Sequence, residues 1–486
     1  MPQFATCLAL SFVFSIGVCR AQGVLDSILD VRPYTWWGAM VTDVTTGDTL
    51  FMRNVEHSFM PASVTKLFTT AAALDQLGPD YHYVTQLYAD GPQITHTLQG
   101  NLVIRGAGDP STGAPGPDHM DLFNAFADSL LALGIHEING HVIGDDNVFD
   151  DIPLGADWSW DDLVYGYAPQ ASGLTFYDAI VEVEVHPTQP GTSGQLSVTP
   201  ELSDYFIFHN QSVTLPRGQP LEEGHAREPN SNHITISSTV PLGYSDPEEL
   251  SVHNPTLYFV HGLRTLLDSR GILVRGKSVD VDSLSTALDY QNARVVARHT
   301  SAPLSELVAT INKESHNLYA EHLLKTLGAE YPDPEEDSEP GSAAMGVAAA
   351  MRTYDAARID TSRLQLVDGS GLSRKNLITP AMTMKLLRYM ALHPDTSIRE
   401  SFLTSLAVGG KDGTLEYRFT GNAAGFGRVR AKTGSLGNVS ALAGYVMRED
   451  GAMLAFVIFA NHFHGRHSRI HSIQESFVNS LVQRYN

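Results

Sequence analysis

The sequence predicts an α+β fold in which strands from the two ends of the chain belong to one domain. Three features predict this class: a β-hairpin near the N-terminus, a three-stranded meander near the C-terminus, and a β-rich region between them. The hairpin is predicted around a short turn that contains Gly47. The predicted strands are residues 36–43, 48–53, 428–433, 439–447 and 453–461. An amphipathic helix at 468–485 follows the last strand and closes the same domain.

The middle of the chain is predicted to hold a β-rich insertion and several helices. Between Tyr177 and Ser238, short alternating runs are separated by Gly, Pro and Asn, as is typical of short strands and their turns. Apolar residues that recur with helical spacing predict helices at 67–74, 120–133, 251–271, 304–327 and 343–357. The helix at 304–327 is expected to break at 314–317, because Ser and Asn favour caps and turns over helix interiors.

Length and charge limit the classes of function. A chain of 486 residues is too long for one simple core, so we expect two or three domains. The apolar fraction of 43% and the charged fraction of 18% are those of a globular protein. Lys and Arg number 32 and Asp and Glu 54, which gives a net charge of 32 − 54 = −22. This charge disfavours a nucleic-acid partner and electrostatic attachment to anionic lipid.

The first residues predict export from the cytoplasm. An apolar run from Leu8 to Val18 precedes Ala21, and small residues stand at the two positions that a signal peptidase recognises. We therefore expect a signal peptide at residues 1–21, no transmembrane segment in the mature chain, and a location in the periplasm or cell envelope. Cys7 and Cys19 are the only cysteines, so the mature chain is expected to have neither a disulfide nor a thiolate metal site.

A candidate nucleophile lies at the start of the first predicted helix, in Pro61-Ala62-Ser63-Val64-Thr65-Lys66. Proline suits a first helical turn, and Ser63 and Lys66 are three residues apart, so their side chains are expected on one helix face. A serine hydroxyl needs a base to remove its proton, and a lysine can be that base when burial or a nearby cation favours its neutral form. The tetrapeptide alone is a weak signal, because it occurs by chance in many chains.

Two further stretches complete a known trio. Ser315-His316-Asn317 and Lys432-Thr433-Gly434-Ser435 follow Ser63 in order, at separations of 315 − 63 = 252 and 432 − 315 = 117 residues. Ser-x-x-Lys, Ser-Asp-Asn and Lys-Thr-Gly together are the signature of penicillin-binding proteins and class A β-lactamases. In this chain His316 stands at the middle position of the second motif, and Ser435 replaces the more usual Thr after the third.

These motifs resemble those of class C, low-molecular-mass penicillin-binding proteins, the D-alanyl-D-alanine carboxypeptidases and endopeptidases of peptidase family S13. The resemblance covers nearly the whole mature chain and includes the long gap between Ser63 and Ser315. It extends to stretches at residues 106–110, 144–146, 158–163, 165–167, 368–374 and 413–415. It implies a serine β-lactamase/DD-peptidase-like core, an antiparallel sheet flanked by helices, at 24–90 and 290–486, with inserted domains at 91–289.

The resemblance also implies a reaction and a role for each motif residue. Ser63 attacks the carbonyl between two D-alanines of a peptidoglycan stem peptide, Lys66 accepts its proton, and Ser315 relays a proton to the leaving amine. Asn317 holds Lys66 or the substrate amide. The terminal carboxylate is bound by the third motif, that is by Lys432, Thr433, Gly434 and Ser435. Such an enzyme needs no metal or organic cofactor, and β-lactam antibiotics are expected as inhibitors.

Two other functions remain open at this stage. A β-lactamase differs only in fast release of the acyl group, and the large insertion disfavours it. A non-catalytic peptidoglycan-binding scaffold is disfavoured because every required side chain is present. The preference between carboxypeptidase and endopeptidase depends on the shape of the groove, which the sequence does not show.

No metal site is predicted from the sequence. His462, His464, His467 and His471 cluster near the C-terminus, but they lack the glutamate that follows the first histidine in metalloproteases. Acidic residues at 145, 146, 150 and 151 do not have the spacing of an EF-hand. We expect a hydrated structural cluster in the first case and a solvated acidic turn in the second.

The export prediction can be checked directly. N-terminal sequencing of the protein isolated from its native host should begin near Gln22. An intact Met1 on soluble cytoplasmic protein would show that residues 1–21 are not a signal peptide.

Overall fold

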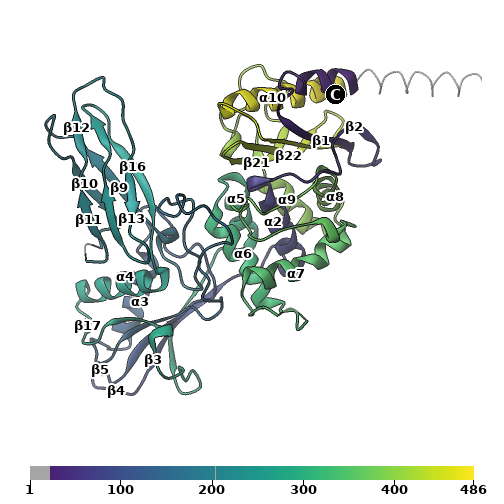
Figure 1. Cartoon of the computed structure of the whole chain (residues 1–486). Helices are drawn as coiled ribbons and strands as arrows, with labels where there is room; N and C mark the ends of the chain where they lie inside the picture. The colour runs from purple at the N-terminus through teal and green to yellow at the C-terminus, as the bar shows by residue number, and fades with distance from the viewer. Residues whose placement is uncertain (1–21, 203, 336, 486) are drawn as a thin grey trace, which may run out of the picture. The chain divides into compact units, whose positions relative to one another are not determined.

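The computed structural model describes residues 22–202, 204–335 and 337–485, so the predicted signal peptide lies outside the described residues (Figure 1). The chain divides into two compact units. The first comprises the described parts of Met1–Tyr81, Pro303–His316 and Val347–Asn486, and the second those of His82–Ala302 and Asn317–Gly346. Each unit is described by itself.

A six-stranded sheet in the order β2-β1-β23-β22-β21-β20 organises the first unit, and every neighbouring pair is antiparallel. Its strands are β1 (Trp36–Asp43), β2 (Thr49–Arg53), β20 (Ala407–Val408), β21 (Val429–Leu436), β22 (Val439–Met447) and β23 (Met453–Asn461). The hairpin from one end of the chain pairs with the last strand from the other, from Trp36 opposite Asn461 to Asp43 opposite Leu454. The predicted hairpin and meander therefore do share one sheet.

Helices cover both faces of this sheet, as the fold class predicts (Figure 1). The strands β22 and β23 are almost wholly buried, as expected for strands with both faces covered. On one face, α10 (His467–Tyr485) packs Phe477, Val478 and Leu481 into a core with β23 residues such as Phe456. A helical segment at residues 22–29 joins this core through Leu25 and Leu29.

The other face carries the helix that follows Ser63. This helix, α2 (Thr65–Leu77), is buried from Thr65 to Leu74 and contacts three other α-helices of the unit. The helices on this side are α2, α5 (Leu304–Lys313), α8 (Pro380–Ala391) and α9 (Thr396–Ser405). We did not predict α8 and α9, although Thr379 caps α8 by accepting a hydrogen bond from Met382 N and is followed by proline.

The second unit is built around a large apolar core with strands and helices on it. Its sheets have the orders β18-β8-β6-β3-β19, β17-β7-β5-β4, β10-β9-β16, β11-β14-β13 and β12-β15. Its first strands are β3 (Val84–Asp90), β4 (Gln93–Ile94), β5 (Thr97–Leu98), β6 (Asn101–Arg105), β7 (Glu137–Ile138) and β8 (Val142–Asp145). The predicted β-rich region then holds β9 (Ile180–His186), β10 (Gln195–Thr199), β11 (Ile207–Asn210), β12 (Val213–Leu215), β13 (His225–Arg227) and β14 (His233–Ile236). The last strands are β15 (Thr239–Pro241), β16 (Asp246–Ser251), β17 (Leu273–Val274), β18 (Ser278–Asp280) and β19 (Arg294–Thr300).

Three helices contribute to this unit, and a fourth is divided between the two units. They are α3 (Asp121–Ala132), α4 (Pro255–Ser269), α6 (Asn317–Glu330) and the divided α7 (Ala343–Ala356). The predicted break between α5 and α6 is present, at Glu314, Ser315 and His316. Within the described residues, no helix is both long and apolar enough to cross a membrane.

Candidate active site

Ser63 lies in a single 3₁₀ turn, Ala62–Val64, between β2 and α2. Its side chain is half-buried, whereas its neighbours Ala62 and Val64 are buried, so the hydroxyl keeps access to solvent. Ala62 has φ +48°, a left-handed conformation that costs a residue with a side chain on the order of 1 kcal/mol or more. Thr65 Oγ1 donates a 2.9 Å hydrogen bond to the Ala62 carbonyl oxygen and fixes this turn. The candidate nucleophile is thus held in a strained turn whose conformation is fixed by a hydrogen bond.

Lys66 is the second residue of α2, and its side chain reaches back to Ser63. Its side chain has no solvent exposure, and its Nζ donates to Ser63 Oγ at 3.1 Å. The same ammonium donates to the carbonyl oxygen of Ser370 at 2.7 Å. A lysine whose amine touches a serine hydroxyl in a buried setting has the geometry of a proton acceptor for that hydroxyl.

A glycine-rich loop supplies the Ser370 carbonyl, and one buried carboxylate shapes that loop. Asp368 accepts hydrogen bonds from Gly371 N at 2.8 Å, Ser373 N at 2.6 Å and Asn376 Nδ2 at 2.6 Å. Gly371 has φ +85°, and a Cβ there would lie 2.0 Å from the Ala62 carbonyl oxygen. The loop therefore approaches the Ser63 turn at a distance that only glycine permits.

Ser315 stands in the break after α5, with φ +64°. Lys432 Nζ donates to Ser315 Oγ at 2.8 Å and to its neighbouring carbonyl oxygen, that of Thr433, at 3.0 Å. The end of α5 is itself anchored, because Lys313 Nζ lies 2.7 Å from Asp412 Oδ2. Ser63 with Lys66 and Ser315 with Lys432 thus form two serine–lysine pairs in the first unit.

Strand β21 brings its backbone against the nucleophile turn. A Cβ on Gly434 would lie 2.6 Å from the Pro61 carbonyl oxygen and 3.0 Å from Ser63 N, so this strand can pass so close only with glycine at 434. The two neighbours of β21 pair with different lengths of it. On one edge β22 pairs along the whole strand, whereas on the other edge β20 pairs only with Arg430 and Ala431. Beyond that point, the described strands leave one edge of β21 open beside Ser63.

The polar side chains of this segment differ in exposure. Thr433 is half-buried, and its Oγ1 donates to Thr414 Oγ1 at 2.9 Å. Ser435 is exposed on the strand that carries Lys432. Thr433 and Ser435 therefore present hydroxyl groups on the stretch of β21 that passes the Ser63 turn.

Lys432 is the group whose proton affinity the site changes most clearly. Burial holds the pKa of Lys432 well below its usual range, the nearby ammonium of Lys66 lowers it further, and the carboxylate of Glu314 opposes both effects. Two buried ammonium groups this close repel each other, which disfavours double protonation. The arrangement therefore favours the neutral form of a lysine amine more than water does.

Seven of the eight residues that the sequence singled out belong to one unit. Ser63, Lys66, Ser315, Lys432, Thr433, Gly434 and Ser435 all belong to the first unit. Asn317 belongs to the second, where its Nδ2 donates to the Tyr167 carbonyl oxygen at 2.6 Å. Its predicted contact with Lys66 or with substrate stays a prediction.

Sequence reasoning missed three contributors to the site: Asp368, Ser370 and Thr414. The Asp-Gly-Ser-Gly run was recognised as a turn, but no role was assigned to it. Ser370 acts through its carbonyl oxygen, which leaves no side-chain signature. Asp368 is easier to find from the sequence than Ser370, because an aspartate before Gly-Ser-Gly often organises a turn with its carboxylate.

Three groups of side chains within the described residues could hold a metal ion: His209/Glu228/His233, Asp146/Asp280/Asp282 and Glu223/Asp246/Glu248. None of them includes a residue of the two serine–lysine pairs. The histidines near the C-terminus do not form such a group; His467 and His471 lie on α10 with ring centroids 6.0 Å apart.

The expectation of a solvated acidic turn was wrong for three of its four aspartates. Asp146 accepts hydrogen bonds from the hydroxyl groups of Ser172 and Thr256. Asp145 is buried and accepts a hydrogen bond from the Tyr290 hydroxyl. Asp150 is buried against the ammonium of Lys325. Buried carboxylates need such partners, and the sequence spacing did not reveal them.

Comparison with known proteins agrees with this geometry. The profile of the D-Ala-D-Ala carboxypeptidase 3 (S13) family matches residues 21–479. The chain belongs to this family. It is therefore a hydrolase of the D-Ala-D-Ala carboxypeptidase type.

Individual relatives span most of the chain. A D-alanyl-D-alanine carboxypeptidase of Actinomadura sp. is 33% identical over 436 residues, which cover 87% of this chain and 77% of the relative. The crystal structure of penicillin binding protein 4 from Haemophilus influenzae is similar with a TM-score of 0.80, at 23% identity, over 94% of this chain and 99% of that one. A second structure of that protein, complexed with a β-lactam, has a TM-score of 0.75 at 22% identity, over the same shares of the two chains. These two structures show that the fold is shared.

The lowered pKa of Lys432 predicts how stability depends on pH. An unfolded lysine holds its proton up to about pH 10.4, whereas folded Lys432 releases it at lower pH. At a pH between the folded and the unfolded pKa of this lysine, the unfolded chain binds one proton more than the folded chain. The free energy of unfolding therefore rises with pH in that range. Lys432→Met should remove this rise, which amounts to about 1.4 kcal/mol for each unit by which the pKa is lowered.

Urea denaturation of wild type and Lys432→Met at a series of pH values from neutral to alkaline tests this. Lys385→Met, at an exposed position of α8, is the matched control and should follow wild type. Parallel curves for wild type and Lys432→Met would contradict a depressed pKa of Lys432.

Proposed function

We propose that this chain is a serine D-Ala-D-Ala peptidase that cleaves peptidoglycan stem peptides through an acyl-enzyme on Ser63. The observation that carries the proposal is the contact of buried Lys66 Nζ with Ser63 Oγ at 3.1 Å. It is made beside a second buried lysine in a chain of the D-Ala-D-Ala carboxypeptidase family. The known activity of the family and the local chemistry support the same reaction.

In the acylation step, Ser63 Oγ forms a bond to the carbonyl carbon between the two D-alanines, and Lys66 takes the hydroxyl proton. The negative charge that develops on the carbonyl oxygen needs preorganised donors. The backbone N–H of Ser63 and an N–H of β21 near Ser435 are proposed for this role. Their support is the close approach of β21 to Ser63 N, which Gly434 permits.

The carbon–nitrogen bond then breaks, and the leaving amine must receive a proton. Ser315 is proposed as the relay: its hydroxyl proton passes to the leaving amine while its Oγ takes a proton from the Lys432 ammonium, which donates to it at 2.8 Å. Water attacks the acyl-enzyme in the second half of the reaction and releases the shortened peptide. No cofactor enters either step.

The terminal carboxylate of the substrate is proposed to bind at Lys432, Thr433 and Ser435. The depressed pKa of Lys432 is consistent with this role, since an incoming carboxylate restores its positive charge and stabilises the pair. A protonated Lys432 in turn favours the neutral form of Lys66, the form that can accept the Ser63 proton. Asn317 is proposed to hold Lys66 or the substrate amide.

We also propose a location and a division of labour. The predicted signal peptide supports export, with the mature enzyme in the periplasm or cell envelope, where its peptidoglycan substrate lies. The unit that holds both serine–lysine pairs is proposed as the catalytic domain. The predicted insertion at 91–289 falls within the second unit.

Labelled penicillin tests the nucleophile. Penicillin resembles the acyl-D-Ala-D-Ala end, but its leaving group stays tethered after ring opening and obstructs the deacylating water. We expect one label per chain, on Ser63, with a mass gain equal to the intact drug. Ser63→Ala should abolish the label and the release of D-alanine from a pentapeptide, measured by mass spectrometry.

Ser472→Ala, at an exposed position on α10, is the control and should label as wild type does. Rapid penicillin turnover would instead identify a β-lactamase, and a folded protein with neither label nor hydrolysis would be a scaffold. Incubation with cross-linked muropeptide dimers separates the endopeptidase from the carboxypeptidase activity. A label on another serine would reject Ser63 as the nucleophile.

A further inference from the structure

Two histidines face the same side of the small sheet β11-β14-β13 in the second unit. Strands β11 and β14 are parallel neighbours, with Ile207 opposite His233 and His209 opposite Thr235. Side chains alternate along a strand, so His209 and His233 lie on one face. The other face carries Ile234 and Ile236, which are buried in the core of the unit. The two imidazoles thus project from the solvent side of adjacent strands, with ring centroids 6.2 Å apart.

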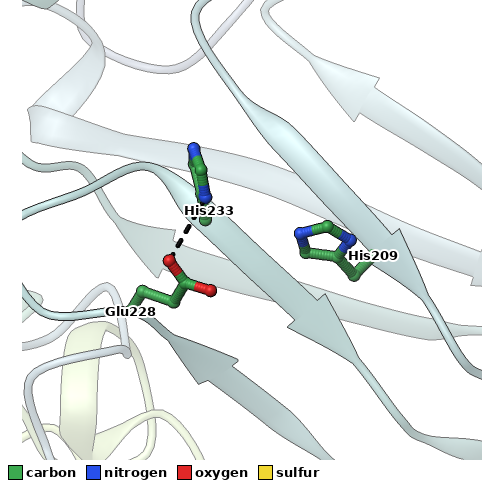
Figure 2. A group of neighbouring side chains, drawn as sticks. All are labelled: His209, Glu228 and His233. Atoms are coloured by element: carbon green, nitrogen blue, oxygen red, sulfur yellow. Dashed lines mark ion pairs between the residues drawn. The ribbon is translucent and has the colours of Figure 1, made fainter.

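A carboxylate is held beside them by the turn between β13 and β14. Glu228 N donates to the His233 carbonyl oxygen at 3.0 Å, and Ser231 bridges the turn by donating to the Glu228 carbonyl oxygen at 3.1 Å and accepting from His233 N at 3.2 Å. In this arrangement Glu228 Oε2 lies 3.2 Å from His233 Nδ1. Figure 2 shows the carboxylate beside His233, with His209 approaching from the neighbouring strand.

We propose that His209, Glu228 and His233 form a binding site for a divalent metal ion of the zinc type. One ligand atom from each residue lies within 4.8 Å of the other two, and small rotations of exposed side chains bring them to the separation that bonds of about 2.0–2.2 Å require. Two imidazole nitrogens and one carboxylate oxygen are a donor set that suits Zn²⁺. The other two groups, Asp146/Asp280/Asp282 and Glu223/Asp246/Glu248, contain only carboxylates and lack this preference.

The solvent exposure of these side chains suits a metal ion that keeps coordination positions for water. The side chain of Glu228 is 63% exposed and that of His233 42% exposed, so water completes the coordination shell. A bound ion would link β11 to the β13–β14 hairpin, two segments that meet only in the folded unit. Metal binding therefore stabilises the fold of this region by mass action. None of the three residues of this site belongs to the two serine–lysine pairs, which lie in the first unit.

Equilibrium dialysis of the full mature chain, without an affinity tag, against Zn²⁺ tests the proposal. Wild type should bind one equivalent through these residues, and His209→Ala and His233→Ala should each weaken its affinity tenfold or more. Glu228→Gln keeps the shape of the side chain and should weaken it severalfold. Zn²⁺ should raise the thermal unfolding temperature of wild type and have a smaller effect on each variant.

His186→Ala is the matched control, because His186 pairs with Glu184 at 3.6 Å on β9 but belongs to none of the three candidate metal groups found among the described residues. It should bind Zn²⁺ as wild type does. Unchanged affinity in His209→Ala would overturn the proposal, since Glu228 and His233 would then be a simple ion pair. Equal loss in His186→Ala, or no binding at millimolar Zn²⁺, would also overturn it. Were an alanine variant to unfold without metal, His209→Gln provides the same comparison.

Discussion

The repulsion between two buried lysine side chains is the constraint on which the site depends. Lys66 and Lys432 have no solvent exposure, and removing an ammonium group from water costs on the order of several kcal/mol. Each is compensated in the same manner, by a serine hydroxyl and a backbone carbonyl oxygen. Hydrogen bonding alone does not offset these costs: burial first, and then the charge of Lys66, hold the pKa of Lys432 well below its usual range. The fold thus favours a neutral lysine amine beside a serine hydroxyl more than water would.

Holding the lysines in this arrangement requires strained or closely packed backbone at four positions around them. Ala62 and Ser315 have positive φ, and Gly371 and Gly434 each lie so close to the Ser63 turn that a side chain would collide with backbone. Such conformations cost about 1–3 kcal/mol each for residues with a side chain, so the surrounding structure must impose them. The hydrogen bonds of Asp368 and the covered six-stranded sheet provide that rigidity. Part of the backbone strain in the chain therefore lies at Ser315 and directly beside Ser63, as in a site organised before substrate arrives.

Much of this arrangement could be predicted from residue order alone, because its signals are local. Pro61 and the spacing of Ser63 and Lys66 predict a helix start with two side chains on one face. Nearly continuous apolar runs near the C-terminus predict β22 and β23 with their observed bounds. The family resemblance, which the three motifs carry, implied the order of the reaction steps and a core domain interrupted by an insertion.

The features that the sequence left undetected depend on tertiary contacts. Ser370 contributes only a carbonyl oxygen, so no residue type indicates its contact with Lys66. The partner of buried Asp150 is 175 residues distant along the chain. His209 and His233 become neighbours only because β11 and β14 pair in parallel in one register, which short alternating runs do not specify. Local patterns predict elements and motifs, whereas long-range register determines which side chains meet.

The most direct measurement of the central claim is the rate at which labelled penicillin acylates Lys66→Arg. Arginine keeps the positive charge but does not act as a base at neutral pH. The claim that Lys66 accepts the Ser63 proton predicts a fall in the second-order acylation rate of at least about 100-fold. Lys385→Arg on the exposed face of α8 should acylate at the wild-type rate. Acylation of folded Lys66→Arg at close to the wild-type rate would contradict the claim and assign the base to another group.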